Sequence, residues 1–355
     1  MSLTLVLNAG SSTLKFQVFK GERSLQRGTI EKPLDYERRY GFHFDAFEDV
    51  KTALIQEKIN FDEFDYVGYR IVHGGEKFSH SIVISDDAMN DIADLSTLAP
   101  LHIPPVIEVL KASSHTFPNA IRVAVFDTAF HATMKKETYT YPLPRQLREK
   151  YGIRKYGFHG MSHQYVTEIA AEQLQKNAKQ LNIITCHLGA GSSISAIQKG
   201  ESVDTSMGFT PLAGLMMATR SGDIDPGILL HLLRDDFEVD ELDHLLNSES
   251  GLKAIAGTGD MRKIIQNSLT DESARLAREM YIKRVIHYIG AYLALVPDVE
   301  AIVFTGGIGE NDDSLRLEIE SRLRHLGVGT TIKILVIPTN EELAIARECW
   351  KIGKK

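Results

Sequence analysis

The chain has 355 residues, of which 43% are hydrophobic and 25% charged, as is ordinary for a globular protein of about two domains. Its net charge of -7 gives no reason to expect nucleic acid or a membrane as partner, so an anionic ligand must be held by local positive charges. Cys186 and Cys349 form no disulfide framework, and the opening "MSLTLVLNAG" lacks the basic region of a signal peptide. These features predict a cytoplasmic protein.

The first predicted element is a β-hairpin, because "LTLVLNAG" and "LKFQVF" are apolar runs joined by a Gly-Ser turn. Residues 21–47 are weakly patterned and predict no element. "FDYVGYRIVHGG" predicts a strand that runs into a Gly-Gly turn, and helical patterns follow from Asp86 and in "PPVIEVLKAS". "IRVAVFDTAF" predicts a buried strand with Asp127 at its carboxyl end.

The second half begins with a turn-rich connector, after which "SHQYVTEIAAEQLQK" predicts a helix with Ser162 as its N-cap. "LNIITCHLGAGSSISAIQKG" then repeats the scheme of strand, Gly-Ser turn and strand. The strand "VEAIVFTGGIGEN" ends in a glycine loop, and "IKILVIPTNEELAIARE" predicts a strand and a helix. A long amphipathic helix precedes them, with one apolar face formed by Ile282, Val285, Ile286, Ile289, Leu293 and Val296.

Because Ala-Gly-Ser-Ser occurs at residues 9–12 and again at 190–193, each time between two predicted strands, we expect a duplicated α/β fold. The two domains, which would face each other across a cleft, are expected at residues 1–147 plus 337–355 and at 148–336.

The Gly-Ser turns expose backbone N–H groups that can bind phosphate oxygens, although for one such turn alone a plain hairpin turn is the more common explanation. Lys15 places a cation near the first turn. The chain contains neither a P-loop nor a Gly-x-Gly-x-x-Gly fingerprint, which argues against a Rossmann dinucleotide site. "TGGIGEN" has room for a flat nucleotide, or is a simple connection between a strand and a helix.

Arg70 and Arg220 lie beside glycines, where a guanidinium can grip a carboxylate or phosphate with two bonds. The alternative is a salt bridge, for example from Arg220 to Asp223 or Asp225. Asp127 lies where α/β enzymes place catalytic groups, or it caps the following turn.

His159 and His163 have a spacing that suggests a metal site, but no third ligand accompanies them. Donation from one of these histidines to a phosphoryl group fits equally well. Glu341 and Glu342 at a predicted helix start gain from the helix dipole, and they are hard oxygen ligands that suit Mg²⁺ beside an amide such as Asn8.

In this order the motifs resemble the acetokinase family, which belongs to the actin, Hsp70 and sugar kinase fold group. The resemblance covers residues 5–347 and implies a duplicated actin-like ATPase (ribonuclease H-like) fold. It also implies reversible transfer of the γ-phosphoryl group of ATP to acetate, a metal (Mg²⁺ or Mn²⁺) and a homodimer. The matching stretches are "VLNAGSSTLKF", "YRIVHGG", "LAPLHIPP", "VAVFDTAFHATM", "YGFHGMSHQYV", "IITCHLGAGSSISAI", "DTSMGFTPLAGLMMATRSGDIDP", "FTGGIGEN" and "IPTNEELAIAR".

The resemblance also implies residue roles. A carboxylate substrate is already a nucleophile at neutral pH, so we expect the catalytic Asp127 to act through position and charge rather than as a base. The residues implied as catalytic are Asp127, His159 and Arg220; as carboxylate-binding, Arg70; as lining the acyl pocket, Val72, Leu101, Phe158 and Pro211; as metal ligands, Asn8 and Glu341; and as nucleotide-binding, Lys15, His187, Leu188, Gly189, Ala190, Gly191, Asp260, Met261, Arg262, Gly307, Ile308, Gly309, Glu310 and Asn311.

The chain departs from the family pattern at Ala190, where the family commonly has asparagine, and it is shorter near residues 21–47 and before "VIPTNEE". Two alternatives remain at this point: a kinase that prefers propionate, and a catalytically idle nucleotide-binding protein of the same fold. Val72 and Phe158 leave little room for a longer acyl chain and so favour acetate.

Overall fold

The computed structural model describes residues 1–10, 13–31, 42–100 and 102–353. The chain divides into two compact units: unit 1 contains Met1–Phe130 and Asn340–Lys355, and unit 2 contains His131–Thr339. Among the described residues, no helix combines the length and hydrophobicity that a membrane crossing would need.

The expected domain boundary at residue 147 differs from the structural one, which follows Phe130. The reason lies in the hydrogen bonds of the intervening segment. Nδ1 of His131 lies 2.8 Å from Oγ of Ser202, and Thr133 donates to the backbone carbonyl of Ser202 at 2.7 Å. The segment is therefore fixed to unit 2, and the chain returns to unit 1 at Asn340 rather than at 337.

Unit 1 contains a mixed sheet with the strand order β3-β2-β1-β4-β6-β5. The first two strands form the predicted hairpin, with Asn8 directly opposite Lys15, and β4 and β6 then add parallel to β1. The strands are β1 (Leu3–Ala9), β2 (Thr13–Lys20), β3 (Arg23–Glu31), β4 (Tyr66–Ile71), β5 (Ile82–Val83) and β6 (Ile121–Phe126).

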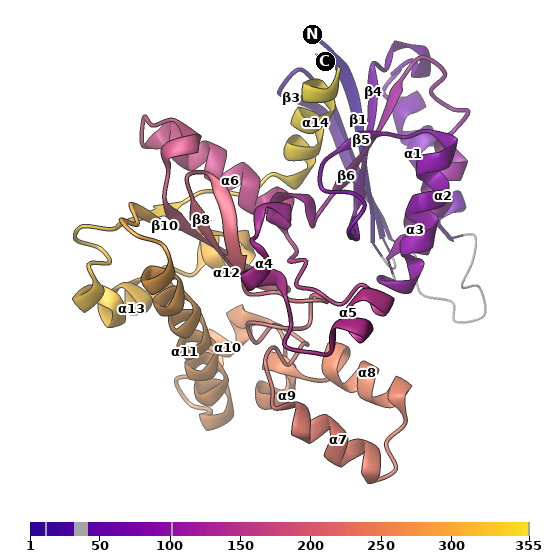
Figure 1. The fold of residues 1–355 in the computed structure, drawn as a ribbon. Coiled ribbons are helices and arrows are strands. Elements are labelled where there is room, and N and C mark those ends of the chain that lie inside the picture. The colour runs from indigo at the N-terminus through magenta and orange to yellow at the C-terminus, as the bar shows by residue number, and fades with distance from the viewer. Residues whose placement is uncertain (11–12, 32–41, 101, 354–355) are drawn as a thin grey trace. The chain divides into compact units, whose positions relative to one another are not determined.

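Helices cover both faces of this sheet, with α1, α2 and α3 on one side and α14 on the other (Figure 1). Gly68 on β4 allows the close approach of α14, because a Cβ at this position would lie 2.7 Å from Cγ2 of Ile345. The helices are α1 (Phe42–Gln56), η1 (Phe61–Glu63), α2 (Asp86–Asp94), η2 (Leu95–Thr97), α3 (Ile103–Ser113) and α14 (Glu341–Ile352), with η3 (Ala129–Thr133) at the unit boundary.

Unit 2 contains a sheet with the order β11-β10-β7-β8-β9, which repeats the pattern of unit 1. Here too an antiparallel hairpin is followed by strands that add parallel to its first strand. The long predicted helix is α11, and its Ile282, Val285 and Ile289 are fully buried against one face. The strands are β7 (Ile183–Leu188), β8 (Ser192–Gln198), β9 (Glu201–Thr205), β10 (Ala301–Thr305) and β11 (Lys333–Val336).

Two helices of unit 2 flank β7: α6 packs on the face that carries Thr185 and His187, and α11 packs on the face that carries Cys186 and Leu188. The helices of unit 2 are α4 (Lys136–Tyr139), α5 (Arg145–Tyr151), α6 (Gly160–Gln173), η4 (Ala178–Gln180), α7 (Pro226–Arg234), α8 (Val239–Ser248), α9 (Gly251–Ala256), α10 (Met261–Asn267), α11 (Glu272–Leu295), α12 (Gly306–Asn311), α13 (Asp313–Leu323) and η5 (Arg324–Leu326).

Candidate functional site

The site residues of unit 1 meet at the carboxyl ends of β1, β4 and β6. Arg70, near the end of β4, donates from Nη1 to Oδ1 of Asn8 at 3.2 Å. It also donates from Nε and Nη2 to Oδ2 of Asp127, at 3.2 and 2.5 Å. These strands are parallel neighbours, so their ends bring together residues that are far apart in the sequence. The capping alternative for Asp127 is wrong, because the carboxylate contacts Arg70 instead.

The ionisation of this cluster depends on burial and on the charge of Arg70. Burial raises the pKa of Asp127 to about 6, and it does so against the opposing effect of Arg70. Burial alone would lower the pKa of Arg70, but Asp127 and Glu341 outweigh it and raise that pKa, which keeps the guanidinium charged. Oδ1 of Asp127 is buried and has no hydrogen-bond partner among the described residues.

Glu341 is the first residue of α14, as predicted, and its carboxylate lies 4.0 Å from Nε of Arg70. The side chain of Asn340 caps this helix by accepting from the backbone N–H of Leu343. Asn8 and Glu341 therefore both lie beside Arg70 and bring an amide oxygen and a carboxylate into one place. Among the described residues, no group of three or more His, Cys, Asp or Glu side chains forms a metal site.

The first Gly-Ser turn is described in part, because Ser11 and Ser12 lie outside the described residues, as does Leu101 of the expected acyl pocket. Lys15 is exposed next to this turn, and Val72 is buried. Sequence reasoning missed His43 of α1, whose Nε2 donates to the backbone carbonyl of Gly10 at 2.9 Å. This bond holds the main chain at the start of the turn, and burial lowers the pKa of the imidazole.

In unit 2 the helix α6 begins differently from the prediction, because its N-cap is His159 rather than Ser162. His159 has φ 57° and ψ 24°, a left-handed conformation that is uncommon for residues other than glycine and often marks functional positions. Ser162 lies inside the helix, where its Oγ is 2.7 Å from Nδ1 of His187 and 2.8 Å from Oγ1 of Thr339.

His159 and Arg220 converge on the second Gly-Ser turn. A Cβ built on Gly191 would lie 3.3 Å from Nε2 of His159 and 3.8 Å from Nη1 of Arg220, so both side chains face this glycine. Burial lowers the pKa of Arg220, and no ion pair to it is found among the described residues. The salt-bridge alternative is wrong, because Asp223 accepts from Tyr288 and Asp225 caps α7.

A set of histidines and hydroxyl groups continues behind His159. Oγ of Ser193 lies 2.9 Å from Nδ1 of His159 and 2.8 Å from Nε2 of His163. Nδ1 of His163 lies 2.7 Å from Oγ1 of Thr185. The ring centroids of His159 and His187 are 4.4 Å apart. Because hydroxyls engage both nitrogens of the buried His163, the metal alternative for this histidine pair is wrong.

Sequence reasoning missed Ser193 and Thr185. The signal that would have found them is strand register, since Ser193 lies directly opposite His187 in the β7–β8 pair. Directly opposed side chains in an antiparallel pair point to the same face.

The remaining nucleotide-binding candidates lie at the ends of β7 and β10 and at the start of α10. "GGIGEN" is not a loop but the short helix α12. Oε1 of Glu310 accepts from the backbone N–H groups of Gly306 and Thr339, which fixes the start of this helix. The Cβ position of Gly189 is 3.9 Å from the backbone nitrogen of Gly307, so Gly-Ser turn and helix are neighbours.

Asp260 is the N-cap of α10 and accepts from the backbone N–H of Arg262, whose side chain also pairs with it. Phe158 is buried and Pro211 is half-buried in unit 2. The backbone carbonyl of Ala190 accepts from the N–H of Ala218, and the side chain of Ala190 is exposed.

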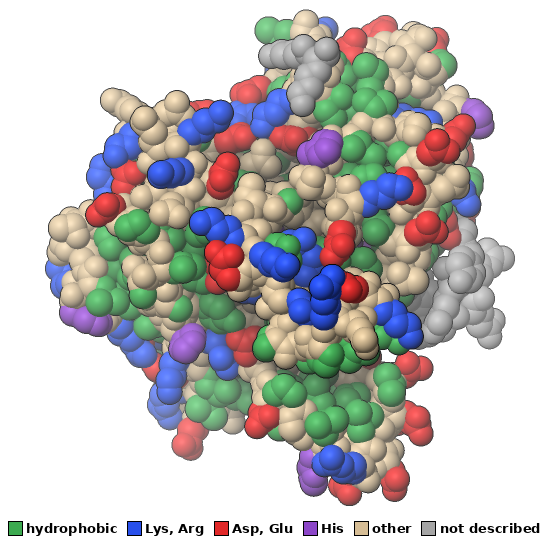
Figure 2. Space-filling view, in the orientation of Figure 1, with side chains coloured by type: hydrophobic (Ala, Val, Ile, Leu, Met, Phe, Trp, Pro, Cys, Tyr) green, Lys and Arg blue, Asp and Glu red, His purple; other side chains and the backbone are tan. Residues whose placement is uncertain are grey.

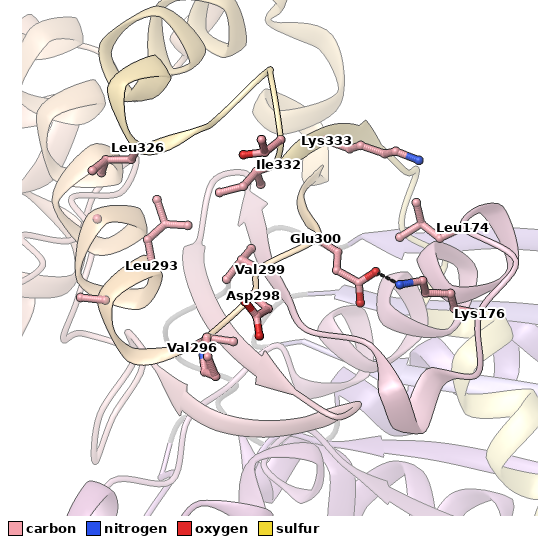
Figure 3. A pocket seen from close by; sticks show the side chains of 14 residues that line it. Leu174, Lys176, Leu293, Val296, Asp298, Val299, Glu300, Leu326, Ile332 and Lys333 are labelled. Atoms are coloured by element: carbon pink, nitrogen blue, oxygen red, sulfur yellow. Dashed lines mark hydrogen bonds and ion pairs between the residues drawn. The ribbon is translucent and has the colours of Figure 1, made fainter.

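A separate hollow of about 750 Å³ lies in unit 2 near the N-terminal ends of β10 and β11 (Figure 3). Leu293, Val296 and Ile332 line it, with an ion pair between Lys176 and Glu300 at one side. None of the expected site residues lines this hollow, and His187 and Thr305 mark the opposite ends of the strands.

Comparison with known proteins identifies relatives along the chain. The model of the acetokinase family matches residues 3–331. An acetate kinase of Clostridium novyi is 43% identical over 394 aligned residues, which cover 99% of this chain and 98% of the relative. An acetate kinase of Anoxybacillus flavithermus is 41% identical over 401 residues, with 99% of each chain covered. The alignments exceed 355 positions, so these relatives carry residues that this chain lacks.

Solved structures agree with these relatives. The acetate kinase of Porphyromonas gingivalis has a TM-score of 0.91 and 34% identity, covering 99% of this chain and all of its own. A propionate kinase of Francisella tularensis has a TM-score of 0.90 and 39% identity, covering 98% of this chain and 99% of its own. The duplicated actin-like ATPase fold expected from the sequence is confirmed by these neighbours and by the repeated strand order.

Proposed function

This chain belongs to the acetokinase family and is a phosphotransferase with a carboxyl group as acceptor, and we propose that it transfers the γ-phosphoryl group of ATP reversibly to acetate. The products are acetyl phosphate and ADP. The observation that carries this proposal is the cluster of Asn8, Arg70, Asp127 and Glu341, which places one charged guanidinium at the strand ends of an otherwise acidic protein.

Arg70 binds the acetate carboxylate in this proposal. A guanidinium offers a planar fork of donors that matches a carboxylate, and the net charge of -7 makes such a local cation necessary. Acetate is ionised at neutral pH and needs no base. Asp127 therefore acts by orienting Arg70 and by its charge, which supports the role expected from the sequence.

Asn8 and Glu341 are the residues that would hold a divalent metal, which we take to be Mg²⁺, with Mn²⁺ as the alternative. The unpaired Oδ1 of Asp127 beside them is a further hard oxygen atom, and a Mg²⁺ site in kinases commonly uses one or two protein groups together with substrate phosphates. When bound, the metal neutralises charge on the phosphate oxygens.

Unit 2 supplies the groups for the nucleotide and for the transferring phosphoryl group. The equatorial oxygens of the transferring phosphoryl group carry the charge that a kinase must neutralise. His159 and Arg220 supply hydrogen-bond donors for these oxygens beside Gly191. We propose the segments 187–191, 260–262 and 307–311 as the nucleotide-binding parts, with Lys15 of unit 1 as a further phosphate contact.

The acyl group would contact Val72, Leu101, Phe158 and Pro211, and the bulk of Val72 and Phe158 favours acetate over propionate. One methylene in an apolar pocket changes specificity by only about 1–3 kcal/mol, so the preference must be measured. We also propose that the protein forms a homodimer and that it is located in the cytoplasm. The cytoplasmic location agrees with the ATP requirement and with the two free thiols.

The test measures acyl phosphate, trapped as the hydroxamate, from Mg-ATP with acetate, propionate or butyrate. We expect the most acyl phosphate with acetate. In Arg70→Ala the amount of acyl phosphate should fall by at least about a hundredfold, because the carboxylate of the substrate then has no cation to pair with. Arg347→Ala is the matched control: this arginine of unit 1 pairs with Glu22, and its loss should leave the product unchanged. Product highest with propionate would change the substrate, and no product with any acid would contradict the proposal.

A further inference from the structure

The structure contains a hydrogen-bonded relay that starts deep in unit 2 and ends at His159. Its members are Thr185, His163, Ser193 and His159. In each neighbouring pair a hydroxyl oxygen lies 2.7 to 2.9 Å from a ring nitrogen. Thr185, His163 and Ser193 are all fully buried. The three inner members therefore cannot exchange hydrogen bonds with bulk water.

The direction of the hydrogen bonds in this relay can be derived from proton counting. Burial, reinforced by the neighbouring His131 and His187, holds the pKa of His163 well below its ordinary value. His163 is therefore neutral and carries one N–H, on either Nδ1 or Nε2. Both of its ring nitrogens face a hydroxyl group, so the position of this proton fixes what each hydroxyl does.

Consider the tautomer of His163 with its proton on Nε2. The Thr185 hydroxyl then donates to Nδ1 of His163, and Nε2 of His163 donates to Oγ of Ser193. The Ser193 hydroxyl is left to donate to Nδ1 of His159. In this arrangement each hydroxyl proton in the relay has an acceptor.

With the opposite tautomer, Nδ1 of His163 donates to Thr185 and the Ser193 hydroxyl donates to Nε2 of His163. Among the described residues, Thr185 Oγ1 has no other hydrogen-bond partner, so its buried proton would have no acceptor. An unsatisfied buried donor costs about 1–3 kcal/mol, which favours the first direction.

From this geometry we propose that Ser193, His163 and Thr185 are positioning residues that hold neutral His159 with its proton on Nε2. Nε2 lies on the edge of the ring that faces Gly191, the glycine that Arg220 also faces, so that proton points toward the site. The inference rests on the proposed function, in which this edge donates to a phosphoryl oxygen. The left-handed backbone of His159 fits a residue whose orientation is fixed from behind.

The test reads the tautomer directly from the long-range ¹H–¹⁵N spectrum of protein labelled at histidine nitrogens. The chain has 13 histidines, and His159→Gln assigns the signals of His159 by their loss. In the wild type we expect a bare Nδ1 and a protonated Nε2 at His159. A proton on Nδ1 of His159 would overturn the proposal.

Thr185→Val keeps the shape of the side chain and removes its donor, far along the relay from His159. We expect a mixture of tautomers at His159. The kcat should fall by about 10- to 100-fold, the range seen when the hydrogen-bond partners of metal-bound histidines are removed, and the KM for ATP should change little. Thr185→Ser restores the hydroxyl and should restore the wild-type spectrum. An unchanged spectrum and kcat in Thr185→Val would overturn the relay.

Ser195→Ala is the matched control, because Ser195 is equally buried on β8 but donates to Thr205 outside the relay. It should change neither the tautomer of His159 nor kcat. If Ser195→Ala had the same effect as Thr185→Val, the effect would come from altered packing and not from the hydrogen bonds of the relay, and the proposal would be overturned. Failure of the proposed function would look different: no acyl phosphate would form in any variant, while the spectra would still report the tautomer.

Discussion

Arg70 directs two donors, Nε and Nη2, at one oxygen of Asp127, Oδ2, and leaves Oδ1 of the same carboxylate without a hydrogen bond among the described residues. A pair formed only for stability would be expected to use both oxygens, as the planar fork of arginine allows. The one-sided geometry keeps a hydrogen-bond acceptor buried at the site, and the raised pKa of Asp127 reflects this incomplete solvation.

Asp127→Asn tests this ionisation through stability. The pKa of Asp127 rises from 3.8 to about 6 on folding, so between these values the folded protein holds a proton that the unfolded chain releases. Stability from this group is therefore full below pH 3.8 and is lost as the pH rises through about 6. In chemical denaturation, the free energy of unfolding of Asp127→Asn relative to that of the wild type should increase by up to about 3 kcal/mol between pH 4 and pH 8.

The control for this experiment is Asp87→Asn, which replaces an exposed aspartate in the first turn of α2. This variant shows how much pH dependence the loss of an exposed carboxylate produces by itself. If the Asp127→Asn difference depended on pH no more than this, Asp127 would ionise as it does in the unfolded chain, and the raised pKa would be refuted.

Arg220→Met separates a catalytic arginine from a structural one. Arg220 is half-buried and has no carboxylate partner among the described residues, so its loss should not lower the melting temperature of the free protein. The loss of a cation at the transferring phosphoryl group should lower kcat by about a thousandfold or more. Melting curves and steady-state rates measure the two effects.

For comparison, Arg278→Met removes an arginine that pairs with Glu318 at 2.6 Å in the same unit. It should lower the melting temperature and leave kcat nearly intact. The reverse pattern, with Arg220→Met unstable but active, would make Arg220 a structural residue.

The sequence predicted those parts of the fold that rest on local patterns. Both hairpins and the buried strands β4 and β10 appear where apolar runs lead into glycines, and β6 appears where an apolar run ends at Asp127. It predicted nothing for β3, because this edge strand is largely exposed and lacks an alternating apolar face. It missed α12 because glycines are poor helix formers, and here the backbone N–H of Gly306 is held by Glu310.

The same division holds for the candidate site. Arg70 and Asp127 could be proposed from sequence because they lie at the ends of recognisable strands, and parallel strand ends meet. Ser193 and Thr185 could not, because their meeting with His163 depends on the register of β7 and β8 and on the position of α6. The register of the predicted hairpin could have paired Ser193 with His187, but the contact with His163 follows from tertiary packing and leaves no pattern in a single sequence.

Ala190→Asn should strengthen nucleotide binding. The side chain of Ala190 is exposed while its backbone carbonyl is held by Ala218, so an asparagine fits without disturbing packing. A new hydrogen bond to the nucleotide would contribute about 0.5–1.5 kcal/mol, which corresponds to a KM for ATP lower by about two- to tenfold. Steady-state kinetics at saturating acetate measure this change, with Ala178→Asn outside the site as control. An unchanged KM for ATP would mean that this position makes no contact with the nucleotide.

Helix α7 supports the proposed homodimer. The helix, "PGILLHLLR", is apolar on nearly all sides, yet none of its residues is buried, with Ile228 49% and Leu230 54% exposed. Figure 2 shows hydrophobic side chains gathered over α7 and α8. A helix of this composition is normally buried, so we expect a second copy of this chain to cover it.

Leu230→Glu should therefore convert a dimer into a folded monomer, because a carboxylate at the centre of an apolar contact loses its hydration without gaining a partner. Sedimentation or light scattering gives the mass, and circular dichroism reports folding. Leu317→Glu on α13 is the matched control, since this leucine is 65% exposed and should leave the dimer intact. A wild-type protein that sediments at 39.6 kDa, or a Leu230→Glu variant that stays dimeric, would exclude α7 as the dimer contact.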